Sequence, residues 1–348
     1  MQRFSDQVEE RTLELAWSLW VEVGVSGWTR RHAASAIDPE PLILFTAALR
    51  DLDPRLRDES TDWCIRYGRY VSAARLRNLL RSEPPKVQSA FGEYAATVNA
   101  HAGVRWPGAT QPRPYRPTGR SRIEDFTRPA LIVLRLRALF GVGARAELIR
   151  SFLAHPDAAP SAADLAGEVS YTKRNVADEL ESLRMAGLLR VTPARNQLRY
   201  RLARPRELWA FGGRRPSRFP RWSATFRLLC AMLDLARRAD ALDPAVRAVE
   251  ARRALRHLSA ELEQAGFEPP SAEATGLASW CDFEQWALDL TASLASGDLS
   301  VPRTAWSNSP DSSPGGAAPP GTAGLPAEGE ASLAPTAGAG REARGPRE

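Results

Sequence analysis

Apolar positions recur at helical spacing through the first hundred residues of the chain. Within the segment Ser5–Val23, Val8, Leu15, Leu19 and Val23 follow one another at intervals of seven, four and four residues. Intervals of this kind place the apolar side chains on one face of an amphipathic helix. Similar patterns follow, so the region from residue 1 to 101 is expected to be a helical domain.

Several local signals set the expected helix starts in this region. Asp38-Pro39 and Asp53-Pro54 each precede an apolar run, and the second run continues to about Tyr67. Asp at the N-cap followed by Pro at the first helical position is a typical helix start. Ser72 begins a further helical pattern, and another helix is expected from about Lys86 to Ala100.

A stretch without helical periodicity follows. Residues Gly103–Arg122 contain four prolines, five arginines and no acidic residue. This composition predicts an extended basic linker, which either acts as a spacer or lies along a phosphate backbone. Helical patterns then return in five segments: Ala130–Phe140, Ala144–Ala154, Trp222–Ala239, Pro244–Ala265 and Asp282–Leu294.

The most informative segment lies between Ser161 and Leu202. Ser161 with Asp164 three residues later forms a variant of the capping box, which predicts a helix start. Thr172 is placed to cap the next helix, and Gly187 stands where a left-handed residue would end it. That second helix carries one apolar stripe, made of Val176, Leu180 and Leu183.

Two short strands are expected after this helix. Leu188–Val191 reads as the first strand, and Leu198–Leu202 alternates apolar and polar residues with the period of a strand. The residues between them, Pro193 to Gln197, would form a short turn with Arg195 at its tip.

This order of elements resembles the winged helix-turn-helix domain of bacterial regulators of the MarR and ArsR type. The resemblance covers about residues 144–203 and includes the run Ala186-Gly187-Leu188-Leu189-Arg190-Val191. It implies binding of operator DNA by a dimer, with the third helix in the major groove and the wing beside the backbone. Two features depart from the family: the wing is short, and the module lies in the middle of the chain.

The resemblance also implies which residues meet the DNA. Lys173, Arg174 and Asn175 occupy the first turn of the third helix, where Arg or Lys can bind guanine and Asn can bind adenine. Backbone contacts are expected from residues before the helix and in the wing. The complete expected set is Tyr171, Thr172, Lys173, Arg174, Asn175, Arg195, Arg199 and Arg201.

The charge distribution supports this interpretation. The whole chain carries a net charge of +6, but residues 101–221 hold 23 cations and 10 anions, a net charge of +13. Within that segment, Arg190–Arg221 contains ten arginines and one acid, Glu207. A basic segment attracts polyanions through counterion release, although a solvated face or a flexible connector would have the same composition.

The sequence does not suggest an enzyme. The four histidines show no metal-ligand spacing, and the chain contains neither a phosphate-binding glycine loop nor a nucleophile elbow. No catalytic residue, metal or cofactor is therefore predicted. The N-terminus has no apolar signal segment and no stretch is long enough for a membrane span, so a cytoplasmic protein is expected.

Together these observations predict a mainly α protein. The expected parts are a helical domain (1–101), a basic Pro-rich linker (102–127), a winged helix-turn-helix with an Arg-rich extension (128–221), a helical C-terminal domain (222–302) and a disordered tail rich in Pro, Gly, Ala and Ser (303–348). The expected function is DNA-binding transcriptional regulation, with double-stranded DNA as the partner. The alternative is a protein-interaction or antitoxin-like accessory subunit. The helical parts would serve for homodimerisation or for binding a protein partner.

Overall fold

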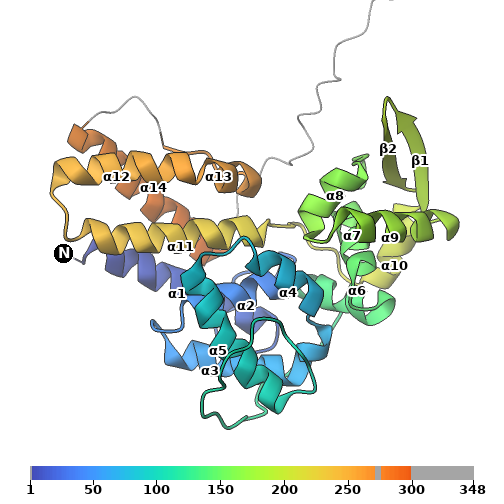
Figure 1. Ribbon diagram of the computed structural model, residues 1–348, viewed down its shortest axis with the longest axis horizontal. Helices are drawn as coiled ribbons and strands as arrows, with labels where there is room; N and C mark the ends of the chain where they lie inside the picture. Colours follow the sequence, from blue (N-terminus) through green and yellow to red (C-terminus); the bar gives the residue numbers. More distant parts are fainter. Residues whose placement is uncertain (1, 271–275, 299–348) are drawn as a thin grey trace, which may run out of the picture. The chain divides into compact units, whose positions relative to one another are not determined.

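The computed structural model describes residues 2–270 and 276–298, and the expected tail at 303–348 lies outside them. The described chain is mainly helical and contains one antiparallel sheet of two strands (Figure 1). The prediction of a mainly α protein with a small β hairpin is therefore confirmed. No helix in these two ranges has both the length and the apolar character that crossing a bilayer requires.

The N-terminal helices follow the predicted pattern closely. They are α1 (Phe4–Glu22), α2 (Pro39–Ala48), α3 (Pro54–Tyr67), the short 3-10 helix η1 (Gly68–Tyr70), α4 (Ala73–Leu80) and α5 (Pro85–His101). Asp53 and Ser72 act as N-caps, since their side chains accept from the backbone N–H groups of Leu56 and Arg75.

The predicted capping role of Asp38 is wrong. Its side chain makes no cap hydrogen bond to α2. Its carboxylate instead accepts from the guanidinium of Arg75, with Nη2 of Arg75 at 2.6 Å from Oδ2. A charge-assisted bond between buried groups is stronger than a bond to a neutral backbone N–H, so the tertiary partner takes the carboxylate.

The segment from 102 to 127 contains no helix or strand, yet it is packed against the N-terminal helices. Trp106 is only 4% exposed and lies in their core. The carboxylate of Asp62 on α3 accepts from the backbone N–H groups of Thr118, Gly119 and Ser121. Burial opposes the charged form, but these bonds lower the pKa of Asp62. The segment is therefore a strap bound to α3, not an extended spacer.

The C-terminal helices share a core with the N-terminal ones. They are α11 (Trp222–Ala239), α12 (Pro244–His257), α13 (Ser259–Ala265) and α14 (Gly276–Ser296). Phe45 on α2 stacks on Phe226 of α11 with ring centroids 4.3 Å apart, and Trp222 stacks on the same ring. The ranges 1–101 and 222–302, expected as separate domains, thus contribute to one hydrophobic cluster.

One helix prediction in this region needs correction. The pattern Pro244–Ala265 predicts a single helix, but it divides at Leu258 into α12 and α13. Gly266 follows α13 directly and ends it with a left-handed φ of +76°.

A second hydrophobic cluster organises the central part of the chain. It is built from α6 (Ile132–Phe140), α7 (Ala144–Ala154), α8 (Ala162–Val169), α9 (Lys173–Met185), β1 (Leu189–Ala194), β2 (Gln197–Leu202) and α10 (Pro205–Gly212). The short 3-10 helix η2 (Pro129–Leu131) precedes α6 and contributes Ala130 and Leu131 to the first cluster. We call residues 144–203, from α7 to the end of the hairpin, the central module. Figure 1 shows the hairpin projecting beyond α8 at one end of this module.

Candidate nucleic-acid interface

The start and the end of α9 are defined by local hydrogen bonds. Thr172 accepts from the N–H of Asn175 at 3.3 Å and caps the first turn. At the other end, Gly187 adopts a φ of +72° and donates to the carbonyl of Arg184 at 2.9 Å, while Leu188 donates to that of Leu183 at 3.0 Å. This pair of bonds is a Schellman motif, so the predicted caps at Thr172 and Gly187 are both confirmed.

The two faces of α9 differ sharply in exposure. Val176, Leu180 and Leu183 are buried in the central cluster, as the apolar stripe predicts. The side chains of the first turn, Thr172 to Asn175, are exposed. Three of the predicted contact residues, Lys173, Arg174 and Asn175, therefore lie together at the positive end of a helix dipole, which favours a nearby anion.

The hairpin places a second group of cations next to this helix. Arg190 pairs with Arg201 and Thr192 pairs with Arg199, so these four side chains share one face of the two-stranded sheet. The opposite face is made of Leu189, Val191, Tyr200 and Leu202, which pack on the central cluster. The strands run further than predicted, and the turn between them is reduced to Arg195 and Asn196.

Arg199 is tied to the module itself. Its guanidinium lies 3.3 Å from the carboxylate of Asp164 and 3.4 Å from the carbonyl of Ala159. The neighbouring N–H of Tyr200 donates to the carbonyl of Pro160 at 3.1 Å. These contacts join β2 to the start of α8, so Arg199 supports the hairpin from inside while Arg195 and Arg201 are exposed.

Tyr171 does not lie with the exposed residues. Its hydroxyl shares a hydrogen bond of 2.7 Å with the hydroxyl of Ser72, which precedes α4. The side chain is half-buried, and burial raises the pKa of the Tyr171 phenol. Six of the eight predicted contact residues are thus exposed on the module, whereas Arg199 is bound to the start of α8 and Tyr171 lies against the N-terminal helices.

Two further bonds attach α4 to the connection between α8 and α9. Arg75 donates through Nε to the carbonyl of Val169 at 3.0 Å, and Asn78 donates through Nδ2 to the carbonyl of Ser170 at 3.0 Å. Ser170 adopts a left-handed φ of +58°, which leaves its carbonyl open to this partner. Nothing in the local sequence of residues 161–202 indicates a partner on α4, and sequence reasoning missed it.

A buried ion network holds the module on these helices. The guanidinium of Arg137 on α6 bonds Glu40 on α2 at 2.7 and 2.8 Å and Glu147 on α7 at 2.6 Å. Arg75 on α4 also bonds Glu40, at 2.8 Å. Burial alone would raise the pKa of Glu147, but Arg137, Arg75 and Arg150 outweigh it and lower that pKa to about 2. The network thus joins four helices, of which only α7 belongs to the module.

The ion pairs also divide the Arg-rich run into two groups. Five of its ten arginines have acidic partners: Arg199 with Asp164, Arg204 with Glu207, Arg214 with Asp125, Arg218 with Asp298, and Arg221 with Glu168. Arg215 lies over the ring of Trp209. Four others have no acidic partner among residues 2–270 and 276–298, and neither do Lys173 and Arg174. These six exposed cations, which we call the unpaired cation set, are Lys173, Arg174, Arg190, Arg195, Arg201 and Arg206.

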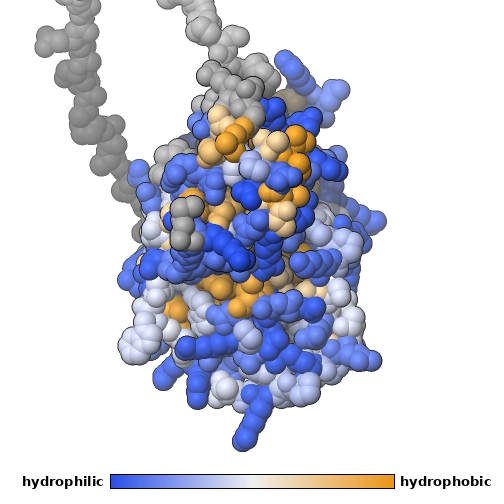
Figure 2. Space-filling model, turned by 90° about the vertical axis from the view of Figure 1, so that its left-hand side faces the viewer, coloured by the Kyte–Doolittle hydropathy of each residue, from blue (hydrophilic) through white to orange (hydrophobic). Residues whose placement is uncertain are grey.

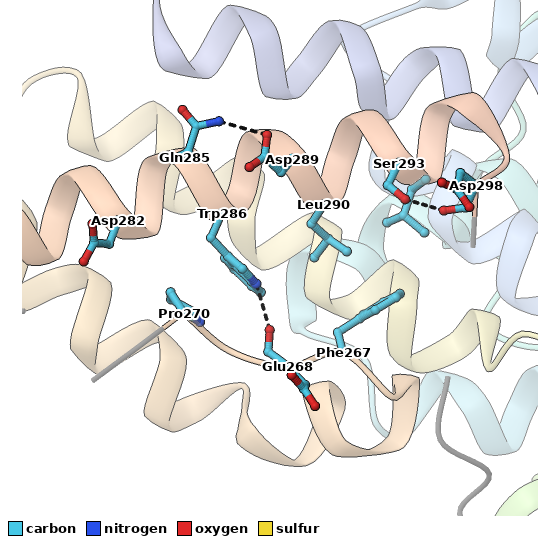
Figure 3. A pocket seen from close by; sticks show the side chains of 11 residues that line it. Phe267, Glu268, Pro270, Asp282, Gln285, Trp286, Asp289, Leu290, Ser293 and Asp298 are labelled. Atoms are coloured by element: carbon cyan, nitrogen blue, oxygen red, sulfur yellow. Dashed lines mark hydrogen bonds between the residues drawn. The ribbon is translucent and has the colours of Figure 1, made fainter. Parts of the chain in front are cut away.

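The C-terminal helices offer a surface of the opposite charge. A cavity of about 650 Å³ lies between α14 and the segment after α13, and four carboxylates line it (Figure 3). The indole of Trp286 points from α14 toward the segment after α13, and its Nε1 donates to the carbonyl of Glu268 at 2.8 Å. The lining carboxylates, Glu268, Asp282, Asp289 and Asp298, would repel a polyanion, so this cavity is not part of a nucleic-acid surface.

Exposed apolar side chains on the same helices form a different kind of surface. Val246 and Val249 on α12 and Leu277 on α14 are all exposed. Figure 2 shows hydrophobic patches among hydrophilic residues on the side of the molecule that these helices help to form. Within the described ranges, no cluster of His, Cys, Asp or Glu side chains has the arrangement of a metal site.

Comparison with known proteins adds no relative. No protein-family model, curated protein or solved structure matches the chain. What the chain can bind must therefore be inferred from its own geometry and charge.

Proposed function

We propose that the central module is a winged helix-turn-helix that binds double-stranded DNA, and that the protein is a cytoplasmic transcriptional regulator. The observation that carries the proposal is the unpaired cation set. Its members lie on the first turn of α9, on both strands of the adjacent hairpin, at the hairpin tip, and on α10, which follows the hairpin. Exposed cations without acidic partners that are gathered on one module give it a positive surface, which attracts a polyanion.

In this proposal α9 enters the major groove. Arg174 or Lys173 would bind the acceptors N7 and O6 of guanine, and Asn175 would bind adenine. The buried stripe of α9 keeps its exposed face in one orientation, so these side chains point away from the core. The N-terminal end of the helix adds a positive potential toward the phosphates on either side of the groove.

The hairpin would contact the DNA backbone. Arg195 at the turn and the facing pair Arg190 and Arg201 carry charge that the protein itself does not neutralise. Phosphate contacts of this kind orient a protein on DNA without reading its sequence. Tyr171 and Arg199, expected on sequence grounds to touch the backbone, are better described as positioning residues, because each is held by a partner within the protein.

The experiment is a titration of the full chain with duplex DNA of random sequence at 50 mM and 200 mM salt. On DNA of random sequence α9 meets no preferred bases, so each member of the unpaired cation set is expected to contact one phosphate, and the slope of log affinity against log salt is about −5. Affinity should then fall on the order of a thousandfold between the two conditions. An absence of duplex binding at 50 mM salt would overturn the proposal.

A second candidate function is docking of a protein partner through the same module. Two apolar side chains favour it: Met185 at the end of α9 is 72% exposed, and Leu198 on β2 is 51% exposed. Exposed apolar side chains on a basic surface suit an acidic partner with an apolar stripe. Binding to such a partner would depend on Leu198, so Leu198→Asp should abolish it, whereas DNA binding should depend on Arg174 and Arg195.

A further inference from the structure

Helix α4 runs along the connection that leads into α9. Ser72, Arg75 and Asn78 bond Tyr171, Val169 and Ser170 at 2.7, 3.0 and 3.0 Å. Tyr171 directly precedes the N-cap of α9, so the first turn of α9 begins where α4 is attached. Any molecule that contacts Lys173 to Asn175 therefore has α4 beside it.

The outer face of α4 is defined by its helical geometry. Successive residues are about 100° apart around a helix, so Asn78 and Arg81 are separated by about 60° and Asn78 and Arg77 by about 100°. Arg75, Leu76 and Leu79 are buried on the inner side. Arg77 and Arg81 are exposed, and they follow Asn78 around the helix on the side away from the core.

The charge on this face is not neutralised within the described residues. Neither Arg77 nor Arg81 has an acidic partner among them. The next acid along the chain, Glu83, lies 3.8 Å from Arg227, and the next cation, Lys86, lies 3.5 Å from Asp234. Glu83 and Lys86 are thus paired, whereas Arg77 and Arg81 are not. Arg75, two positions before Arg77, is by contrast buried and pairs with Asp38 and Glu40 in the ion network.

We propose that α4 is a second DNA-contacting element, with Arg77 and Arg81 binding phosphates beside the groove that α9 enters. This inference rests on the proposed function. Arg77 and Arg81 are four residues apart, about 6 Å along the helix axis, so both can reach the same DNA strand. Three hydrogen bonds and the buried ion network hold α4 in place before DNA arrives, so little conformational freedom is lost on binding.

Contacts from α4 would enlarge the footprint of the protein on DNA. A winged helix alone would cover the groove met by α9 and the backbone met by the hairpin. With α4 included, the protein contacts phosphates on both sides of the α9 first turn. The structural connection between α8 and α9 would then be a junction between two DNA-contacting parts of the chain.

The experiment compares three full-length proteins in duplex titrations across a salt series: wild type, Arg77→Ala/Arg81→Ala, and the control Arg3→Ala/Arg256→Ala. The control removes the same charge from exposed positions outside both the module and α4. Loss of two phosphate contacts should reduce the salt slope by about 2 and lower affinity roughly 60-fold at 0.1 M salt. The control should match wild type, and the preference among DNA sequences should be unchanged in both variants.

The outcomes separate this inference from the function on which it rests. If wild type binds and the α4 variant keeps the wild-type slope, the inference is wrong and the proposed function stands. If wild type shows no duplex binding at low salt, both are wrong. Circular dichroism checks that the α4 variant is folded, and a preserved helical signal is expected because Ala is favourable at exposed helix positions.

Discussion

The arginines of this protein lie in very different ionic environments. Arg137 is completely buried between Glu40 and Glu147, Arg184 lies in an exposed pair with Glu181, and Arg174 has no acidic partner in the described chain. The ionic environment, not the residue type, decides whether an arginine stabilises the fold or is available to a ligand. Counting arginines along the sequence therefore overstates the basic surface.

The first residue-scale prediction separates base reading from backbone contact. Arg174→Ala should relax sequence preference at one base step, at a loss of about 1–3 kcal/mol for the preferred site. Arg195→Ala should weaken binding to every sequence alike and reduce the salt slope by about 1. The measurement is competition binding against a randomised duplex library. Equal effects of the two substitutions on sequence preference would contradict the assignment of α9 to the groove.

The second residue-scale prediction concerns the buried ion network. Arg137→Met removes the cation and leaves the carboxylates of Glu40 and Glu147 buried, so the free energy of unfolding should fall by about 3–5 kcal/mol. Arg184→Met breaks an exposed pair and should lower it by at most about 1 kcal/mol. Urea denaturation measures both. A loss below about 1 kcal/mol in Arg137→Met would show that the network does not hold the module.

At the scale of elements, helix ends define the central module. Ser161 and Asp164 bond each other's backbone N–H groups at the start of α8, and a Schellman motif ends α9. These caps orient the helices so that the stripe of α9 meets the core and its first turn faces outward. Because caps depend on residues close in sequence, the starts of α8 and α9 and the end of α9 can be predicted without any tertiary contact.

An element-scale prediction follows from the two glycines of this region. Gly187 ends α9 with φ of +72°, where a side chain adds strain, so Gly187→Ala should lower the free energy of unfolding by about 1–2 kcal/mol. Gly167 is a matched control inside α8, since a Cβ there meets open space and its φ is not in the left-handed region. Gly167→Ala should raise the same free energy by about 0.5–1 kcal/mol. Substitutions that act in the same direction would argue against the left-handed end.

For the whole molecule, the described chain is organised around two hydrophobic clusters. One unites α1, α2, α11 and α14, and the other holds the central module. Arg75 and Arg137 connect the two clusters through Glu40. The module is thus attached to the helical part by buried charges as well as by the chain.

Acidification provides a test at this scale. His32 is buried between Ser18 and the carbonyl of Leu294, and burial lowers its pKa to about 4 from 6.5, with Arg31 and Arg218 adding to the effect. Between these values the unfolded chain binds a proton that the folded chain does not. The free energy of unfolding should therefore fall as the pH drops from 6.5 to 4, by up to about 3 kcal/mol from this group.

The carboxylates with lowered pKa values act in a lower pH range. The pKa of Glu147 falls from 4.5 to about 2, so its contribution to the free energy of unfolding is present above pH 4.5 and is lost as the pH approaches 2.

The effect of His32 is measured by urea denaturation at pH values from 7 to 4. His32→Gln should flatten the dependence of the free energy of unfolding on pH, and the exposed control His257→Gln should leave it unchanged. An unchanged slope in His32→Gln would contradict the burial of a neutral His32.

Many local features of this protein could be predicted from its sequence: most starts of the N-terminal helices, the caps at Thr172 and Gly187, the apolar stripe of α9 and the hairpin. Each depends on residues that are neighbours along the chain. Which charges are neutralised depends on the folded arrangement, because an arginine and its acidic partner can be far apart in sequence. Arg137 and Glu40, for example, are separated by 97 residues. Tertiary contacts also place Tyr171 against Ser72 and α4 beside the start of α9. For the same reason Asp38 bonds Arg75 instead of capping α2. Local periodicity cannot reveal such pairs, since a charged residue in a helix pattern looks the same whether it meets water or a buried counter-ion.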